Sequence, residues 1–358
     1  MMFLQIARTH FMKFRRDRTA FVMTFIVPIA FFSSFALMYG GRGGSSTSRI
    51  RVAVIDQAQS AQSRTLVERI RGEKSLTMLD GMSAATAESA IRKGDLSLAI
   101  LLPPDFSSAG RKPKVVLLAD TSDPFSSRIV ATTLQKLTLG KFPIDVQTRD
   151  VLGETKKRNP RVAFAAAGLG VMFLLFVASA SGGALIDEAE NGTLDRILSS
   201  RVSMTQLLLG KVAYLVALST VQLTITFTWA AFVFGVELAE HFAGFLLMTV
   251  ATAIATASFG LMLATLCRSR AQLSALSTLV VLTMSAVGGS LFPRFLMPDG
   301  MKKLGLLTIN GWALEGFLKV FWREEALLSL WPQLTVLLLA GLTFFTTART
   351  MARRWEAQ

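Results

Sequence analysis

Apolar runs long enough to cross a lipid bilayer recur along this chain and limit its fold more than any other feature. A transmembrane helix needs about 20 apolar residues. Charged residues make up only 17% of the chain, whereas a soluble protein carries about 25%. The sequence therefore predicts a polytopic α-helical membrane protein with six transmembrane helices, built on the runs Ala20–Tyr39, Val162–Leu185, Leu207–Phe234, Phe242–Leu266, Leu273–Phe292 and Leu327–Thr347.

The formal net charge of +14 could indicate a nucleic-acid partner. The Lys and Arg residues, however, cluster beside the apolar runs, where membrane topology explains them better. We therefore expect the lipid bilayer, and no nucleic acid, as a partner. A single cysteine, Cys267, excludes an intrachain disulfide, and two histidines leave little for a metal site. His10 and His241 are expected to be interfacial residues rather than ligands.

Residues 1–18 have the pattern of an amphipathic helix lying on the membrane surface. Most basic side chains point away from one apolar face, which consists of Phe3, Ala7, Phe11 and Phe14. The basic start of a signal peptide is the alternative. The apolar run that follows is too long for that, because the apolar region of a signal peptide has about 7–15 residues. We therefore expect an uncleaved first span at residues 19–40 and a cytoplasmic amino terminus.

Residues 41–158 have the composition of a soluble protein and predict a small α/β domain. A flexible Gly- and Ser-rich linker stands at residues 40–46. Strand and helix patterns then alternate, which is typical of an α/β fold. Strands are expected at 51–56, 76–79, 96–102 and 115–119, and helices at 60–71, 84–93 and 124–139. The segment contains no GxGxxG and no Walker A sequence, so nothing in it favours nucleotide binding.

The charges of the short loops predict the orientation of the chain. With the amino terminus inside, the loops and ends that become cytoplasmic carry basic residues, namely Arg196, Arg201, Lys211, Arg268, Arg270, Arg349, Arg353 and Arg354. The connection between the third and fourth spans carries Glu237 and Glu240 instead. This distribution follows the positive-inside rule. We therefore expect a cell inner (plasma) membrane protein with both termini cytoplasmic and residues 45–158 outside, as an inserted extracytoplasmic α/β domain.

The remaining spans are expected at residues 160–186, 205–235, 242–267, 272–292 and 326–348, before a cytoplasmic tail at 349–358. Between the last two spans, residues 293–323 predict a pair of short, half-buried helices at the outer leaflet, with Trp312, Glu315 and Phe317 as their notable side chains. Pro298 and Asp299 can start the first helix, and Asn310 can cap the second. Glu315 could be functional because its neighbours are apolar, although water access at the outer surface explains it better.

Residues 187–200 form the most informative segment, a short polar helix between two long apolar segments. A polar helix of this kind projects from the bilayer toward another molecule. Leu194, Ile197 and Leu198 are spaced to give an apolar face that could enter a partner's cleft. A merely solvated cytoplasmic loop is the alternative. The residues expected to contact a partner are Asp187, Glu188, Glu190, Asn191, Gly192, Thr193, Leu194, Ile197 and Leu198.

The whole chain resembles the permease subunits of ABC-2 type transporters that have a large external domain after the first span. The resemblance rests on the order and spacing of Val52–Asp56, Gly94–Phe106, Ala119–Pro124, Glu190–Leu194, Gly288–Pro293, Met297–Pro298 and Asn310–Phe317. It implies a dimer with a second copy or a paralogue, and two copies of an ATP-binding subunit. Residues 187–200 would be the coupling helix that rests in a cleft of the ATPase. ATP and Mg would bind to that partner, and this chain would hold no cofactor, metal or catalytic residue.

The second span is rich in small residues, which let helices approach closely in lipid. Helix packing is the favoured interpretation of this pattern. An apolar translocation path is the other interpretation, and the residues that would line it are Phe164, Met172, Phe173, Phe176 and Met284.

The sequence thus predicts the membrane subunit of an ATP-driven, multidrug-type exporter for a hydrophobic or amphipathic, drug-like or lipid-like substrate. Export of polysaccharides or ions by the same architecture is an alternative, and so is a non-transporting membrane anchor or sensor. A membrane-embedded enzyme is not expected, because the chain contains neither HExxH nor GxSxG.

Overall fold

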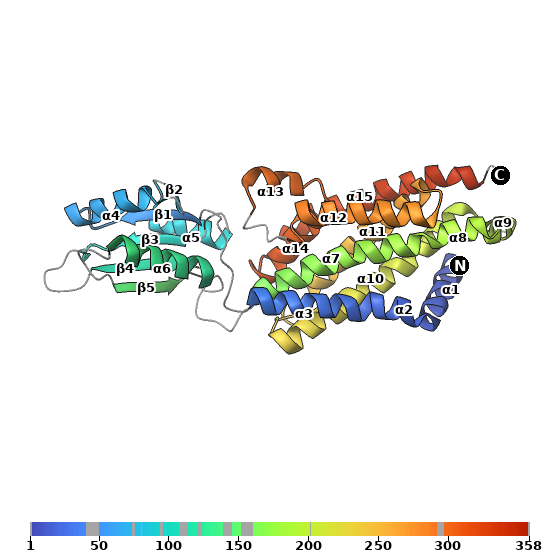
Figure 1. The fold of residues 1–358 in the computed structure, drawn as a ribbon, viewed down its shortest axis with the longest axis horizontal. Helices are drawn as coiled ribbons and strands as arrows, with labels where there is room; N and C mark the ends of the chain where they lie inside the picture. The colour runs from blue at the N-terminus through green and yellow to red at the C-terminus, as the bar shows by residue number, and fades with distance from the viewer. Residues whose placement is uncertain are drawn as a thin grey trace. The chain divides into compact units, whose positions relative to one another are not determined.

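The chain divides into two units, each with its own hydrophobic core. One unit is Gly44–Arg158, and the other combines Met1–Gly43 with Asn159–Gln358 (Figure 1). The structure is a computed structural model. It describes residues 2–40, 50–73, 76–79, 81–93, 96, 98–106, 113–119, 124–138, 145–151, 160–200, 202–291 and 297–356.

The unit of residues 44–158 is built on a five-stranded sheet in its described part. The strand order is β2-β1-β3-β4-β5, in which β3 and β4 are antiparallel and the other neighbours are parallel. The strands are β1 (Ile50–Asp56), β2 (Leu76–Leu79), β3 (Leu98–Leu102), β4 (Lys114–Ala119) and β5 (Asp145–Asp150).

Alternation along β3 assigns the helices of this unit to opposite faces of the sheet. Leu98, Ile100 and Leu102 share a core with α4 (Ala61–Arg71) and α6 (Pro124–Thr138). Ala99 belongs to a second core with α5 (Ala84–Lys93). Successive side chains of a strand point to opposite faces, so the unit is an α/β structure of three layers. The sequence pattern misses β5, because five of its six side chains are polar or charged.

The other unit is helical and contains every segment long and apolar enough to cross a membrane in the described residues. Six such stretches are found: Arg18–Leu37, Val162–Glu190, Met204–Phe234, Phe242–Leu266, Arg270–Gly288 and Leu327–Trp355. Their number matches the expectation from the sequence. The elements are α1 (Met2–Arg16), α2 (Arg18–Phe21), η1 (Val22–Ile26), α3 (Val27–Gly40), α7 (Pro160–Gly182), α8 (Ala184–Glu190), α9 (Thr193–Leu198), α10 (Met204–Phe234), α11 (Phe242–Leu266), α12 (Arg270–Gly288), α13 (Asp299–Gly305), α14 (Ile309–Phe321), η3 (Leu327–Leu330), α15 (Trp331–Met351) and η4 (Ala352–Trp355).

Small residues of α7 let it lie directly against α11. A Cβ atom added to Gly260 would come 2.5 Å from the carbonyl oxygen of Ala178, and one added to Gly182 would come 2.7 Å from the carbonyl oxygen of Gly260. Backbone therefore meets backbone at this crossing, as small residues allow in membrane helices. Helix packing accounts for this part of the small-residue pattern.

One side of α1 packs against the helical unit. Ile6, Ala7 and Phe14 pack against the cluster that includes the start of α10, whereas Phe11 is 49% exposed. Residues 6, 7, 10 and 14 follow a helical repeat, and Phe11 lies beside that stripe rather than on it. The expected membrane-facing side of Phe3, Ala7, Phe11 and Phe14 stays a prediction, and the side chain of Phe3 lies outside the described residues.

The segment before the last span also needs a correction. Thr308, rather than Asn310, caps α14, since its hydroxyl accepts a hydrogen bond from the Gly311 N–H. Asn310 is fully buried, and its amide donates to Ser285 and Ser290. The helix is accordingly part of the core rather than half-buried.

Candidate functional site

The polar segment after α7 consists of two short helices rather than one. We refer to α8, α9 and the turn between them as the α8–α9 segment (residues 184–198). Gly192 adopts φ +64°, a left-handed conformation that glycine adopts without strain. Asn191 ends α8 and Gly192 begins α9. The expectation of a single helix over 187–200 is therefore wrong, because the turn at Gly192 breaks it.

The apolar face expected on this segment is turned toward the chain itself. Leu194 is only 1% exposed and belongs to the same buried cluster as Met204 and Leu207 at the start of α10. Ile197 and Leu198 pack against that cluster. Burial within the chain's own core makes Leu194 unavailable to a partner, so the expected contact is wrong at Leu194, whereas Ile197 and Leu198 are only partly buried.

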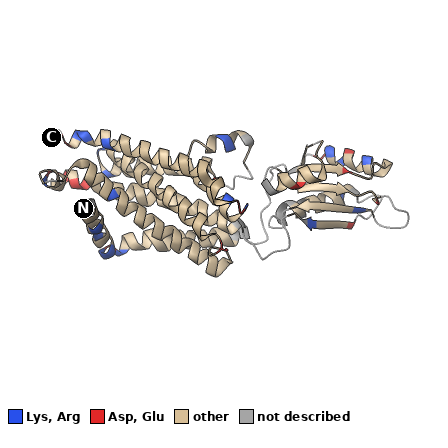
Figure 2. Cartoon of the chain, turned by 180° about the vertical axis from the view of Figure 1, so that it is seen from behind, with Lys and Arg blue, Asp and Glu red and all other residues tan. Residues whose placement is uncertain are grey.

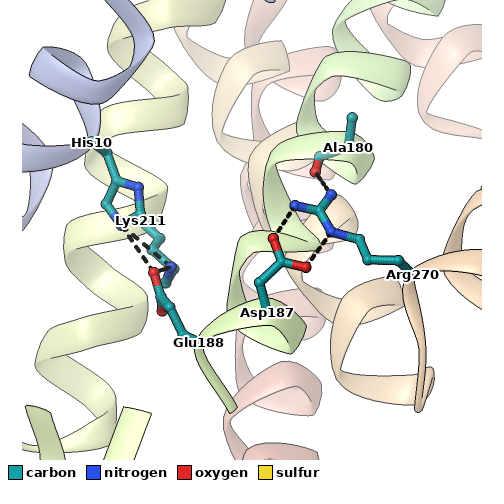
Figure 3. Close-up of polar contacts among 6 residues, drawn as sticks. All are labelled: His10, Ala180, Asp187, Glu188, Lys211 and Arg270. Atoms are coloured by element: carbon teal, nitrogen blue, oxygen red, sulfur yellow. Dashed lines mark hydrogen bonds and ion pairs between the residues drawn. The ribbon is translucent and has the colours of Figure 1, made fainter. Parts of the chain in front are cut away.

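Asp187 fixes one side of the segment to α12. Its carboxylate accepts hydrogen bonds from Arg270 Nε at 2.7 Å and from Nη2 at 2.5 Å, and Arg270 Nη1 donates to the Ala180 carbonyl at 2.8 Å (Figure 3). Gly183 makes room for the guanidinium, because a Cβ atom there would lie 2.5 Å from Arg270 Nη1. One arginine thus joins the end of α7, α8 and the start of α12.

Glu188 fixes the other side of the segment to α10 and α1. The Lys211 ammonium donates to Glu188 Oε1 at 2.8 Å and to His10 Nε2 at 3.3 Å (Figure 3). Lys211 is 3% exposed, so this ion pair is largely withdrawn from water. Adjacent carboxylates therefore hold the segment from two directions.

His10 takes part in this cluster as a neutral ring. Burial, with smaller contributions from the charges of Lys211 and Lys13, lowers its pKa from 6.5 to about 4. Its Nε2 also lies 3.7 Å from Glu188 Oε1, but a neutral imidazole forms no ion pair there. At neutral pH, His10 is therefore an acceptor for the Lys211 ammonium.

The outward surface of the segment is polar. Glu190, Asn191 and Thr193 are exposed, together with two residues outside the predicted set of contact residues, Asp195 and Arg196. At the same end of the helical unit lie both termini (Figure 1). Any molecule that meets this surface therefore meets hydrogen-bonding groups and charges.

Sequence reasoning named His10, Lys211 and Arg270 but did not place them in this site. Lys211 carried a signal, since a lysine within an apolar helix usually has a partner. Arg270 was interpreted only through membrane topology. The partners themselves lie far apart in the sequence, so only the packed helices bring them together.

The side chains considered for a translocation path lie in or against the core of the helical unit. Phe164 and Met172 are buried within it, and Phe173, Phe176 and Met284 pack against it. This packing accounts for them without a path, and their part in translocation stays a prediction.

The residues singled out on α14 have structural partners. Trp312 Nε1 donates to the Leu306 carbonyl at 2.6 Å. Glu315 Oε1 lies 3.1 Å from Arg323 Nη1. Phe317 is buried and stacks on Phe227 of α10.

Comparison with known proteins places this architecture in a family. The family model for "ABC-2 family transporter protein" matches residues 18–349. The chain belongs to the ABC-2 transporter family. It is 26% identical over 320 residues to the inner membrane transport permease YhhJ of Escherichia coli (strain K12), covering 85% of each chain. It is 19% identical over 342 residues to the linearmycin resistance permease protein LnrN of Bacillus subtilis (strain 168), covering 86% of this chain and 87% of the relative.

Membership of the ABC-2 family confirms several coarse predictions. The chain is a multi-pass membrane protein and a transport permease by family. Its relatives are transporter subunits rather than enzymes, and ABC-2 permeases usually work with an ATP-binding subunit.

Proposed function

We propose that this ABC-2 permease exports its substrate by coupling to a separate ATP-binding subunit through the α8–α9 segment. The observation that carries the proposal is the double attachment of α8. Asp187 is bonded to α12 and Glu188 to α10. A force applied to the exposed surface of the segment would therefore reach two membrane helices through short, charged hydrogen bonds, which are the stronger kind.

The partner on this surface would bind differently from the way the sequence suggests. Because Leu194 is buried, the contact would use Glu190, Asn191, Thr193, Asp195 and Arg196. These side chains favour a polar cleft with complementary charges. ATP and Mg would bind to that partner. Two ATP-binding subunits and a second permease, as a copy or a paralogue, complete the proposed assembly.

The orientation is part of the proposal. Lys and Arg residues gather at the end of the helical unit where both termini lie (Figure 2). Short loops rich in Lys and Arg are typically cytoplasmic. We therefore place the α8–α9 segment and both termini in the cytoplasm, and residues 45–158 outside it.

The substrate is proposed to be hydrophobic or amphipathic. One relative is named for resistance to linearmycin, which favours a drug-like compound over a polysaccharide or an ion. A non-transporting anchor or sensor is the competing function. It would need neither an ATPase nor the paired attachment of α8.

Charge reversal on the exposed surface tests the coupling proposal. Asp195→Lys and Arg196→Glu should each weaken co-purification with the cognate ATP-binding subunit and reduce substrate-stimulated ATPase activity. Reversal of a charge at a contact usually lowers the association rate and affinity. The partner-free permease should hydrolyse no ATP.

The matched control is Glu240→Lys, which reverses an exposed carboxylate in the connection between α10 and α11. This variant should bind the ATPase normally. Normal complex formation and normal transport by both Asp195→Lys and Arg196→Glu would contradict the proposal. Recovery of no ATPase with the wild-type chain would favour the anchor.

A further inference from the structure

Three groups that can bind a metal ion lie together in the helical unit, away from the α8–α9 segment. Glu237 and His241 belong to the connection between α10 and α11, and Glu324 belongs to the connection between α14 and η3. One ligand atom from each lies within 4.8 Å of the other two. Because α10 starts near the α8–α9 segment, the connection after its last residue lies at the opposite end of the unit (Figure 1).

We propose that Glu237, His241 and Glu324 form a binding site for a divalent transition-metal ion, with zinc as the best match. Zinc binds imidazole nitrogen and carboxylate oxygen at about 2.0–2.2 Å, which places neighbouring ligand atoms about 3.4 Å apart in a tetrahedron. His241 Nε2 already lies 3.5 Å from Glu324 Oε1. Rotation of the glutamate side chains would close the wider separations. The imidazole favours zinc over calcium and magnesium, which prefer oxygen ligands.

Two basic side chains close to Glu324 in sequence contact other carboxylates. Arg323 Nη1 lies 3.1 Å from Glu315 Oε1, and Lys319 Nζ lies 3.5 Å from Glu325 Oε2. Two carboxylates near an imidazole would repel one another, and a divalent ion offsets that repulsion.

Two further features orient the ligands. The His241 ring meets the Phe321 ring edge-on, with 5.7 Å between centroids. Glu324 has φ +49°, a left-handed conformation that is uncommon for a residue other than glycine. Backbone strain of this kind persists only where surrounding interactions maintain it. The imidazole of His241 and the carboxylate of Glu324 thus come from two different connections and lie 3.5 Å apart.

A bound ion would tie the α10–α11 connection to the connection after α14. Three protein ligands leave a fourth position for water, as in open zinc sites. The ion would thus stabilise this end of the helical unit. The inference revises the expectation that His241 is not a ligand, and it stands independently of the proposed coupling to an ATPase.

Zinc binding to the purified full chain tests the site. The protein, carrying a histidine-free affinity tag, is stripped with a chelator and titrated with zinc chloride in detergent. Bound metal is counted by elemental mass spectrometry, and the thermal shift caused by zinc is recorded. We expect a single zinc ion per chain, and an affinity more than about tenfold lower in His241→Ala and in Glu324→Gln.

The matched control is Glu240→Gln, which removes a neighbouring carboxylate outside the trio and should keep wild-type affinity. His10→Ala tests the other histidine and should also keep wild-type affinity for zinc. The site would be overturned if His241→Ala and Glu324→Gln bound zinc as tightly as the wild type. It would also be overturned if the wild type bound no stoichiometric zinc. If His241→Ala misfolds, Glu237→Gln decides, since it retains the imidazole and should also lose affinity.

Discussion

The Lys211 ammonium and the Glu188 carboxylate lie 2.8 Å apart, and Lys211 is almost fully withdrawn from solvent. This ion pair joins α10 to α8. The second carboxylate oxygen, Glu188 Oε2, is buried without a hydrogen-bond partner among the described residues. Because the Lys211 side chain is almost fully buried, its ammonium depends on Glu188 as its counter-ion.

Removing one partner of the Lys211–Glu188 ion pair should destabilise the fold more than removing both partners. Glu188→Gln leaves a buried lysine without its counter-ion, and breaking a buried pair in this way typically costs about 3–5 kcal/mol. Lys211→Met together with Glu188→Gln should recover much of that loss. The measurement is the apparent melting temperature in detergent of the two single variants and the double variant. Additive losses would show that the two residues do not interact.

Gly183 should control the Asp187–Arg270 contact indirectly. In Gly183→Ala, the new methyl group would displace the Arg270 guanidinium, because the two would lie 2.5 Å apart. Asp187 and Arg270 are partly exposed, so stability should change by less than about 1 kcal/mol. Substrate-stimulated ATPase activity of the complex should nevertheless fall.

Arg270→Lys provides the comparison for that variant. Lysine cannot reproduce the paired contact of a guanidinium with a carboxylate, so its effect should resemble that of Gly183→Ala. The double variant should be no worse than either single one. Gly300→Ala, at a glycine with open space around it, should be silent. If Gly300→Ala lowered ATPase activity as much as Gly183→Ala, the proposed role of the Asp187–Arg270 contact would lose its support.

Acidification should destabilise the chain through His10. The pKa of His10 is about 4 in the folded chain, below the ordinary histidine value of 6.5, and burial is the main cause. The stability that a neutral His10 contributes is fully present above pH 6.5 and is lost as the pH falls toward 4, by about 3 kcal/mol at most. We expect His10→Phe to melt with a shallower pH dependence than the wild type over this window. The same pH dependence of the melting temperature in His10→Phe and in the wild type would contradict a neutral, buried His10.

Labelling of introduced cysteines should report the orientation of the chain. In a Cys267→Ala background, which has no other cysteine, Ala61→Cys on α4 and Thr193→Cys on α9 both place thiols at exposed positions. An impermeant maleimide should label the first in intact cells and the second only after permeabilisation. The reverse pattern would invert the proposed topology.

The membrane character of this chain could be predicted because it depends on local composition. About 20 consecutive apolar residues suffice to indicate a span wherever they stand, so six stretches could be recognised without knowing how they pack. The close crossing of Gly182 and Gly260 could be anticipated only as a tendency of small residues. The sequence did not identify which helix α7 would meet.

Which side of each helix faces the core could be known only from the tertiary structure. Leu194 was expected to face a partner, because its spacing with Ile197 and Leu198 defines an apolar face but not what covers it. The packing of α10 decides that the chain covers this face itself. Asn310 illustrates the same limit, since its residue type suits a helix cap as well as a buried contact with Ser285.

The six spans and the α/β character of residues 44–158 follow from hydrophobicity and short-range periodicity, and the family resemblance follows from the order and spacing of short motifs. The contact of Asp187 with Arg270, and the contacts of Lys211 with Glu188 and His10, are instead set by how the helices pack. The same holds for the approach of Glu324 to His241. These partners are separated by tens to hundreds of residues, and only the packing of the helices determines which distant charges come within hydrogen-bonding distance.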